Sequence, residues 1–361
     1  MPTLAALGWA EPFQSAARPY LQNSELVPAR VCAVHRGRYV LGTSTGELSG
    51  ILPGRLRQRC DPEHLPVVGD WVLCLPNPSG PTPIEQCLPR RSCLTRQRAA
   101  GEHGAQAMAA NLDTVFLTTA VNQDFNLRRL ERYLALVFQS GAQPVVLLTK
   151  ADLADGRPGA LEAQVAAAAA CAAGAPVHAL SAANGEGLQA LDNYLQPAHT
   201  VALLGSSGVG KSTLANALLG REANATSAIR HGDDRGRHTT THRELFMLPS
   251  GAMLIDTPGM RELALWDAEQ GLTQAFDDVE LWLGQCRFSD CSHSSEPGCA
   301  VLGALARGEL SPERYRSYFK LQNELAHQER QQSVHAQRQH ARSFSRMARN
   351  ASRKRRLERG E

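Results

Sequence analysis

Between residues 110 and 260, short apolar runs alternate with stretches in which apolar residues recur every three or four positions. The runs predict buried strands, and the recurring pattern predicts amphipathic helices. We expect strands over residues 112–120, 144–150, 176–182, 200–205, 243–248 and 252–259. We expect helices over residues 126–141, where Gly141 closes the helix, 161–175, 187–195 and 211–220. Such alternation builds a mostly parallel α/β sheet.

Residues 25–98 have a different pattern, with short strands broken by Gly and Pro. The strands lie within residues 29–44, 46–54, 66–76 and 83–97, a spacing that favours a small barrel. About five strands with basic edges resemble an OB-fold, which binds oligonucleotides. A barrel that serves as a packing module is the alternative. Residues 1–24 are a weakly patterned leader, and the chain beyond Glu269 becomes mainly helical around a cysteine cluster.

Charge is unevenly distributed along the chain. From Lys320 to Glu361 there are eleven Lys/Arg against four Asp/Glu, and from Arg30 to Arg98 ten Arg against five acids. Basic flanks around an acidic middle indicate a polyanionic partner, for which nucleic acid is the best candidate. No apolar run is long enough for a membrane helix, and the first residues do not read as a signal peptide. We therefore expect a cytoplasmic protein.

A phosphate-binding loop follows the expected strand at residues 200–205. Residues 205–212 read GSSGVGKS and fit G-x-x-x-x-G-K-[ST] without a mismatch, between a strand and a helix. The loop's N–H groups and the helix N-terminus face a phosphate. Lys211 would bridge the β- and γ-phosphates, and Ser212 would ligate Mg²⁺. The expected phosphate-binding set is Gly205, Ser206, Ser207, Gly208, Val209, Gly210, Lys211, Ser212 and Thr213.

Three further motifs point to the rest of one nucleotide. "LIDTPGM" places Asp256 where an acidic residue holds Mg²⁺ through water, and Gly259 where an N–H senses a γ-phosphate. "TKAD" places Thr149, Lys150 and Asp152 at a strand end. The Asp152 carboxylate can accept the N1–H and N2–H₂ of guanine, a pair of donors that adenine lacks. "SAANG" begins with Ser181 and Ala182 at the next strand end and offers N–H groups to guanine O6.

Together these motifs resemble those of the translation-factor type of GTPase, except that "TKAD" and "SAANG" precede the phosphate loop. Such an order is typical of a circularly permuted domain. Residues 25–320 resemble the ribosome small-subunit-dependent GTPase A family, which has an OB-fold, a permuted GTPase domain and a zinc-binding helical domain. The resemblance implies an OB-fold at 25–98, a GTPase domain at 99–270 and a zinc-binding helical domain at 271–335, with a leader at 1–24 and a basic tail at 336–361. Thr149 departs from the family pattern, which usually has Asn there.

The resemblance also identifies residues 236–245 as a switch segment. Thr240 is the candidate that would reach Mg²⁺, and Thr239 and Thr241 remain open as alternatives. Met260 follows the D-T-P-G motif, where related enzymes carry a glutamine that positions water, and a thioether cannot do this. The resemblance suggests His238 for that role; a solvated side chain is the alternative. The catalytic set is thus Lys211, His238 and Thr240.

A cysteine cluster lies near the end of the predicted folded region. Cys286, Cys291, His293 and Cys299 fall within fourteen residues and suit tetrahedral Zn²⁺. Four protein ligands leave no place for water, so we expect one structural zinc ion. In the tail, Arg338, Arg342, Arg346, Arg349 and Arg353 share one helical face. That face would bind ribosomal RNA phosphates, although a solvated end is the alternative.

These observations predict a GTP hydrolase that binds the small ribosomal subunit and its RNA, acts in late maturation of the subunit, and is stimulated by it. GTP, GDP, Mg²⁺ and zinc are the expected ligands, and we expect a monomer with no membrane partner. The alternative is a zinc-stabilised RNA-binding module with a passive guanine-nucleotide pocket. A kinase that uses ATP is disfavoured, because it would give "TKAD" and "SAANG" no role.

Overall fold

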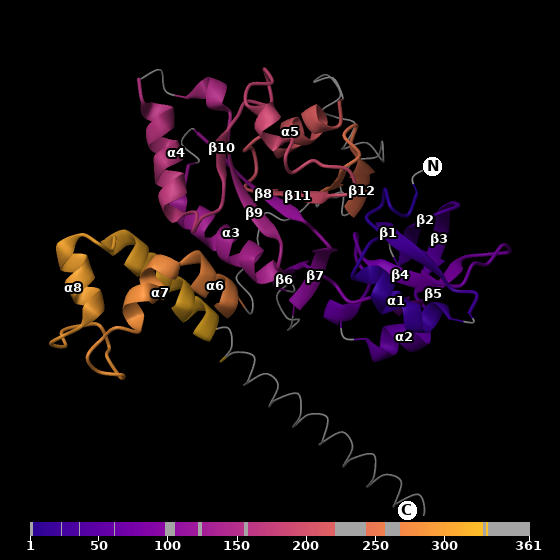
Figure 1. Ribbon diagram of the computed structural model, residues 1–361, viewed down its shortest axis with the longest axis horizontal. Coiled ribbons are helices and arrows are strands. Elements are labelled where there is room, and N and C mark those ends of the chain that lie inside the picture. Colours follow the sequence, from indigo (N-terminus) through magenta and orange to yellow (C-terminus); the bar gives the residue numbers. More distant parts are fainter. Residues whose placement is uncertain are drawn as a thin grey trace, which may run out of the picture.

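The structure is a computed structural model that describes residues 3–22, 24–35, 37–60, 62–97, 105–121, 125–154, 158–220, 243–256, 268–327 and 330. Its centre is the predicted α/β sheet (Figure 1). The strands lie in the spatial order β10 (Val177–Ala179), β9 (Gln143–Thr149), β8 (Thr114–Ala120), β11 (Thr200–Gly205), β13 (Met253–Asp256) and β12 (Arg243–Met247). Pairing is parallel from β10 to β13, whereas β12 is antiparallel to β13, so the mostly parallel sheet is confirmed.

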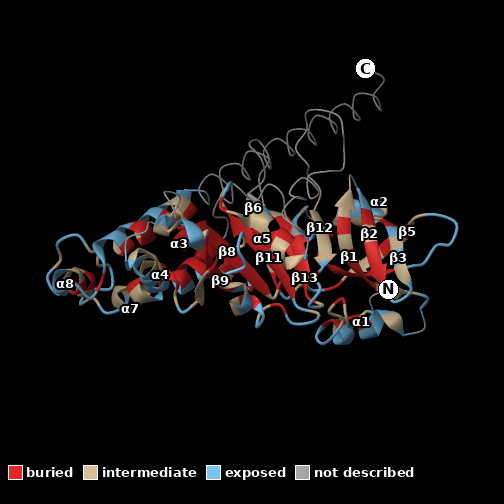
Figure 2. Ribbon diagram, turned by 90° about the horizontal axis from the view of Figure 1, so that it is seen from above, coloured by how far each residue is buried: buried red, intermediate tan, exposed pale blue. Residues whose placement is uncertain are grey.

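Helices cover both faces of this sheet. One face packs against α3 (Leu127–Ser140) and α4 (Ala160–Cys171), and the other packs against α5 (Lys211–Leu218). Helix α3 ends as predicted, since Gly141 adopts a left-handed φ of 81° that a residue with a side chain rarely adopts. The strands between these layers are buried (Figure 2).

The helix expected at residues 187–195 is wrong in extent. Only a short 3₁₀ helix forms there, η3 (Leu188–Leu191), and turns continue to Leu195. Asp192 and Asn193 follow η3, and such residues compete with helical backbone bonds and favour turns. Leu191 and Leu195 nevertheless bury their side chains in the sheet's second core cluster.

Five strands form the N-terminal barrel. They are β1 (Val27–His35), β2 (Arg38–Thr43), β3 (Gly46–Ile51), β4 (Trp71–Cys74) and β5 (Thr82–Cys87). The ring runs β1-β2-β3-β5-β4 and closes by pairing of β4 with β1, and β3 is parallel to β5. The helices α2 (Gly54–Arg59) and η1 (Pro62–His64) lie between β3 and β4. This arrangement confirms the OB-like barrel.

The leader contributes to the barrel's core. Helix α1 (Phe13–Leu21) buries Phe13 and Ala17, and the Trp9 ring lies 4.7 Å from the Trp71 ring, measured between centroids. These side chains form one apolar cluster with barrel residues and with Met253 of the α/β sheet. The first twenty or so residues therefore join the barrel to the sheet.

Barrel and α/β sheet are also continuous through hydrogen bonding. Strand β1 pairs antiparallel with β12 at Ala33–Glu244 and Val34–Arg243, which makes one eleven-stranded sheet. Beside this junction β6 (Cys93–Gln97) and β7 (Ala105–Ala110) form a separate antiparallel pair (Figure 1). The domain boundary that we expected at residue 98 falls between these two paired strands.

The buried side chain of Arg30 joins the barrel, the leader and the α/β sheet by hydrogen bonds. It lies on β1 with 1% exposure, and its guanidinium donates to Gly69 O, Asn111 O, Thr200 Oγ1 and, closely, Leu7 O. These acceptors belong to the barrel, the turn before β8, strand β11 and the leader. Burial lowers the Arg30 pKa to about 10, and nearby Asp113 partly offsets this effect.

The C-terminal region packs on α3. It comprises α6 (Glu269–Ala275), α7 (Asp277–Leu283), α8 (Ala300–Arg307) and a helical stretch at residues 312–327. A Cβ on Gly271 would lie 2.0 Å from Ala135 O, so glycine permits the close approach of α6 to α3. A buried ion pair joins Arg314 Nη1 to Glu131 Oε1 at 3.0 Å, and Arg314 Nε contacts Asp278 Oδ2 at 2.7 Å.

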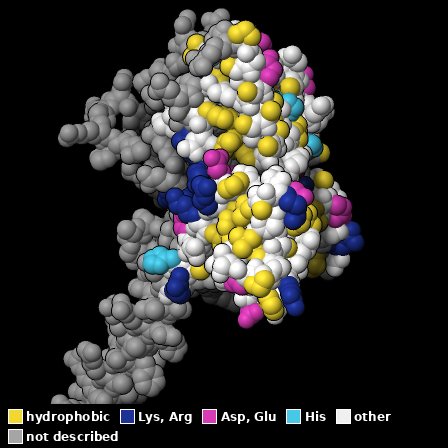
Figure 3. Space-filling view, turned by 90° about the vertical axis from the view of Figure 1, so that its left-hand side faces the viewer, with side chains coloured by type: hydrophobic (Ala, Val, Ile, Leu, Met, Phe, Trp, Pro, Cys, Tyr) yellow, Lys and Arg dark blue, Asp and Glu magenta, His cyan; other side chains and the backbone are white. Residues whose placement is uncertain are grey.

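The end of the molecule that carries α4 and the C-terminal helices exposes many apolar side chains (Figure 3). On α4 these are small, namely Ala163, Ala166, Ala169 and Ala170. Among the described residues no helix is long and apolar enough to cross a membrane. The predicted basic face at Arg338, Arg342, Arg346, Arg349 and Arg353 lies outside the described residues.

Candidate nucleotide site and metal centre

The predicted nucleotide motifs lie at one edge of the α/β sheet. Strands β9, β10, β11 and β13 are parallel, so the turns that follow them lie at the same carboxyl edge. "TKAD" follows β9, "SAANG" follows β10, and the phosphate loop follows β11. Ligands of open α/β sheets bind at such edges.

The phosphate loop has the backbone that its glycines predict. Gly208 and Gly210 have left-handed φ values of 81° and 97°, and α5 begins at Lys211. Val209 is buried, whereas Ser207 and Ser212 are exposed. Lys211 Nζ donates to Gly205 O at 2.7 Å and, closely, to Ser206 O. The ammonium group is therefore held over the loop where phosphate oxygens would bind.

Direct hydrogen bonds join the turn that contains "TKAD", here called the base-recognition turn, to the phosphate loop. Thr149 Oγ1 lies 2.5 Å from Val209 O and 3.2 Å from Thr119 O, and Lys150 Nζ donates to Gly208 O at 2.7 Å. Lys150 has a left-handed φ of 60°, which turns the chain from β9 towards the loop. Threonine in place of the family's usual asparagine thus still braces the two motifs.

The turn that contains "TKAD" also contacts the residue directly before "SAANG". Ala151 N donates to Leu180 O at 3.1 Å, and Ala151 begins the 3₁₀ turn η2 (Ala151–Leu153). Asp152 is exposed on this turn, so its carboxylate is free to meet a ligand from solvent. Ser181 is buried and Ala182 is half-buried; Ser181 Oγ accepts from Ala183 N at 3.3 Å, which shapes the turn.

Of the predicted nucleotide-site residues outside the phosphate loop and the base motifs, the structure describes only Asp256. Asp256 is the last residue of β13, at the same edge as the phosphate loop. Gly259, His238 and Thr240 lie outside the described residues, as do Thr239, Thr241 and Met260.

Sequence reasoning missed one part of the site, the end of β8. Thr118 Oγ1 donates to Leu204 O at 3.0 Å, and a Cβ on Gly205 would lie 2.3 Å from Thr118 O. Thr119 O accepts from Thr149, as described above. Thr118 and Thr119 therefore fix the spacing between the phosphate loop and "TKAD". The available signal was two adjacent hydroxyl residues at the end of a strand with an apolar centre.

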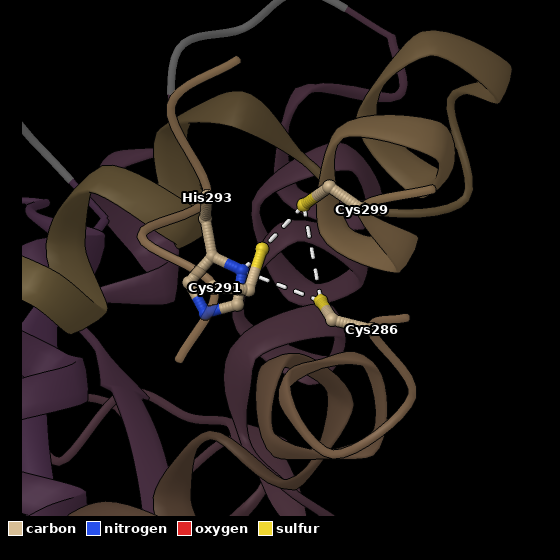
Figure 4. A group of neighbouring side chains, drawn as sticks. All are labelled: Cys286, Cys291, His293 and Cys299. Carbon is tan, nitrogen blue, oxygen red and sulfur yellow. Dashed lines mark hydrogen bonds between the residues drawn. The ribbon is translucent and has the colours of Figure 1, made fainter. Parts of the chain in front are cut away.

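The four predicted metal ligands come together (Figure 4). One ligand atom from each of Cys286, Cys291, His293 and Cys299 lies within 4.8 Å of the others. Cys286 Sγ and Cys299 Sγ are 3.8 Å apart, and His293 Nδ1 lies 3.4 Å and 3.5 Å from them. A tetrahedral ion with metal–sulfur bonds of about 2.3 Å and metal–nitrogen bonds of about 2.0–2.1 Å gives edges near these values. The cluster could hold one metal ion.

Local structure favours metal binding at Cys299 and Cys286. Cys299 caps α8, since its Sγ accepts from Leu302 N at 3.4 Å. Desolvation raises the pKa of Cys286. Hydrogen bonds, among them those from the N–H groups of Ala300 and Val301, together lower it by more, so the pKa lies below its ordinary value. A thiolate is the form that binds a metal.

The strand order, the phosphate loop and the base motifs together define a P-loop GTPase whose nucleotide motifs occur in circularly permuted order. A model of the RsgA GTPase family matches residues 87–266. A model of the ABC transporter family matches residues 188–359, a span that includes the same phosphate loop.

Whole-chain comparisons agree with the first of these matches. The chain is 46% identical over 336 residues to a small ribosomal subunit biogenesis GTPase RsgA from Opitutus terrae, covering 90% of each chain. The crystal structure of YjeQ from Thermotoga maritima shares 29% identity with a TM-score of 0.62, over 83% of this chain and 99% of that one. YloQ, described as a circularly permuted GTPase, shares its fold at 23% identity and a TM-score of 0.59, over 85% and 97%. The chain belongs to the RsgA GTPase family.

Proposed function

We propose that the protein hydrolyses the β–γ phosphoanhydride of GTP on the small ribosomal subunit during late maturation, and that the subunit stimulates its turnover. Within the chain, the main support for the proposal is a pair of hydrogen bonds, from Thr149 to Val209 and from Lys150 to Gly208. They hold the base-recognition turn against the phosphate loop, so a single guanine nucleotide would span both. The biogenesis GTPases named among the relatives support the ribosomal part.

Guanine is selected by Asp152. Its exposed carboxylate follows β9 at the edge that carries the phosphate loop. Two oxygens accept the N1–H and N2–H₂ donors of guanine, and adenine would leave the carboxylate facing an acceptor. The Lys150 stem lies along the purine, and N–H groups of the turn that begins with Ser181 and Ala182 serve O6.

Hydrolysis is a direct attack of water on the γ-phosphorus. The bond from the water oxygen to phosphorus forms and the bond from phosphorus to the β–γ bridging oxygen breaks. GDP and inorganic phosphate leave, and a proton of the water is released to solvent. Lys211 exchanges the carbonyl oxygens of Gly205 and Ser206 for β- and γ-phosphate oxygens. His238 positions the water, and Gly259 N–H senses the γ-phosphate.

Two metal ions complete the proposal. Ser212, Thr240 and Asp256 would hold Mg²⁺, which neutralises charge on the phosphates when it is bound. Zn²⁺ fits the cluster of Cys286, Cys291, His293 and Cys299, since three thiolates and one imidazole at tetrahedral distances are typical of structural zinc. All four positions are protein ligands, so the ion stabilises the C-terminal region and takes no part in hydrolysis.

The barrel of residues 25–98 and the tail of residues 336–361 would contact ribosomal RNA. Their excess of arginine and the OB-like topology of the barrel support this assignment. The leader at 1–24 extends the barrel, residues 99–270 form the GTPase domain, and residues 271–335 form the zinc-binding domain. We propose that the protein acts as a cytoplasmic monomer.

Single-turnover GTP hydrolysis with purified small subunits tests the proposal, with large subunits as the control. We expect faster hydrolysis with small subunits and no change with large ones. GTP binding without hydrolysis in either case would favour the alternative, an RNA-binding module with a passive guanine-nucleotide pocket. Equal stimulation by both subunits would contradict the assignment to the small subunit.

A further inference from the structure

Arg243 is a half-buried cation with no oxygen acceptor among the described residues. It is the first residue of β12, and its Nη2 lies 2.9 Å from Met108 Sδ on β7. A thioether is a weak acceptor. The Nε atom is buried without any partner. Because burying a charge is costly unless the charge is paired, the described residues alone leave this guanidinium in an unfavourable position.

The other buried arginines do not share this property. Arg30 donates to carbonyl and hydroxyl oxygens, Arg90 binds Asp70 through both carboxylate oxygens, and Arg314 binds Glu131 and Asp278. Each of these is satisfied within the chain. Arg243 therefore differs from them in lacking an oxygen acceptor among the described residues.

Arg96 places a second positive charge near Arg243. Arg96 on β6 lies close enough to lower the Arg243 pKa further, after burial has already lowered it, to about 10. Arg96 directs Nε and Nη2 to Gln106 Oε1 at 3.1 Å and 2.9 Å, so its own charge has no carboxylate partner in the described structure. Glu244 follows Arg243 but points to the opposite face of β12 and lies 3.6 Å from His35 Nε2.

We propose that Arg243 and Arg96 form a phosphate-binding site at the junction of β6, β7 and β12, and that it takes a backbone phosphate of ribosomal RNA. The inference rests on the proposed binding to the small subunit. The two guanidinium groups contact Gln106 and Met108, which lie two residues apart on β7, so they present neighbouring positive charges without a carboxylate partner among the described residues. A phosphate would supply the missing negative charge. The site lies between the barrel and the GTPase sheet, so a bound RNA strand would contact both (Figure 1).

The test is binding of the full-length protein to purified small subunits over a range of salt concentrations. Arg243→Met places a thioether side chain next to Met108, and Arg96→Met is the second variant. Each should lower the steepness of log affinity against log salt by about 1. At about 0.15 M salt each should weaken binding roughly fivefold. Arg307→Met, which removes an exposed arginine of α8 that already pairs with Glu309, is the control and should change neither.

Thermal unfolding separates a ligand site from a structural contact. Arg243→Met should melt at the same temperature as the wild type or higher, because an unpaired buried charge is removed. A melting temperature several degrees lower would overturn the proposal, and so would unchanged affinity and salt dependence in a protein that binds subunits. If inorganic phosphate stabilises the GDP-saturated wild type more than Arg243→Met while subunit affinity is unchanged, the RNA assignment is wrong. A wild type that binds no subunits would instead contradict the proposed function.

Discussion

At the residue scale, the site depends on a few polar contacts that tie two loops into one. Thr149 and Lys150 bond from the base-recognition turn to the phosphate loop. Thr118 and Thr119 set the distance between these two loops. Substitutions at this edge should therefore separate nucleotide binding from turnover according to which part of the nucleotide they touch.

Asp152→Asn should weaken GTP binding about ten- to a hundredfold. One acceptor oxygen becomes an amide donor that faces guanine donors, and loss of a charge-assisted contact costs roughly 1.5–3 kcal/mol. Fluorescent-nucleotide titration measures the change. Asp192→Asn, an exposed aspartate after η3, is the matched control and should bind GTP normally. Equal GTP affinity in Asp152→Asn and the wild type would remove Asp152 from base recognition.

His238→Ala should bind GTP as well as the wild type does but lose most of the turnover that the small subunit stimulates. A group that orients the attacking water acts in the transition state and not in the bound ground state. Nucleotide affinity and stimulated kcat should be measured on the same preparation. Unchanged stimulated turnover would transfer the role to Arg235, Arg237 or a ribosomal group.

At the element scale, the close packing of α6 on α3 joins the C-terminal region to the GTPase sheet. Gly271 lets the two helices touch, and Arg314 binds Glu131 of α3 from the helical stretch at 312–327. Helix α6 therefore cannot rotate freely on α3.

Gly271→Ala should destabilise the protein by about 1–3 kcal/mol. The new Cβ would lie 2.0 Å from Ala135 O, which forces α6 away from α3. Urea unfolding gives the difference. Gly284→Ala is the control, since a Cβ there meets nothing within 4 Å and should be neutral. Equal loss in both variants would indicate a general glycine effect and not helix packing.

Cys291→Ser should lose its zinc and lower the stability of the C-terminal helices, because binding energy of a structural site contributes to folding. GTP affinity should change little, since the cluster lies outside the phosphate loop. Metal analysis by mass spectrometry and thermal unfolding are the measurements. Cys60→Ser is the control, because Cys60 lies outside the cluster and this variant should keep its metal. A Cys291→Ser protein with one zinc per chain and the melting temperature of the wild type would refute the site.

Much of this element-scale picture follows from sequence because periodicity encodes burial. The strands at β8, β9, β11 and β13 and the helix α3 follow directly from apolar patterns and from Gly141. Helix α1 does not, since Phe13 and Ala17 are its only buried residues and Pro19 lies inside it. The β1–β12 pairing is also hidden, because a sequence pattern shows that a strand is buried and not which strand lies beside it.

The candidate site shows the same division. Residues in fixed motifs were predicted, since the chemistry requires those letters at that spacing, and the metal ligands came together as expected. The contacts of Thr118 and Thr119 depend on how β8 lies beside β11, which no local motif specifies. Arg243 was missed because its unusual property is the absence of an oxygen acceptor among the described residues, and this becomes visible only in three dimensions.

At the scale of the whole molecule, the permuted order places Asp256 shortly before α6 in the chain. A change at the γ-phosphate would then have to pass along only the twelve residues 257–268 to reach a helix that packs on α3. We expect GTP-analogue and GDP complexes to differ in amide hydrogen exchange over residues 271–300. Peptides from β2 and β3 of the barrel serve as the internal reference. Identical protection of residues 271–300 in both complexes would exclude this coupling.

The pairing of β1 with β12 also protects the protein from misassembly. Without the barrel, β12 would be the outermost strand of the GTPase sheet, and its N–H and C=O groups would be open to another chain. Exposed outer strands promote aggregation and strand exchange. Removal of the leader would also uncover the apolar surface around Met253. The barrel therefore acts as a built-in cover for the GTPase sheet, and a fragment that begins after it should be poorly soluble even if every nucleotide-binding residue is retained.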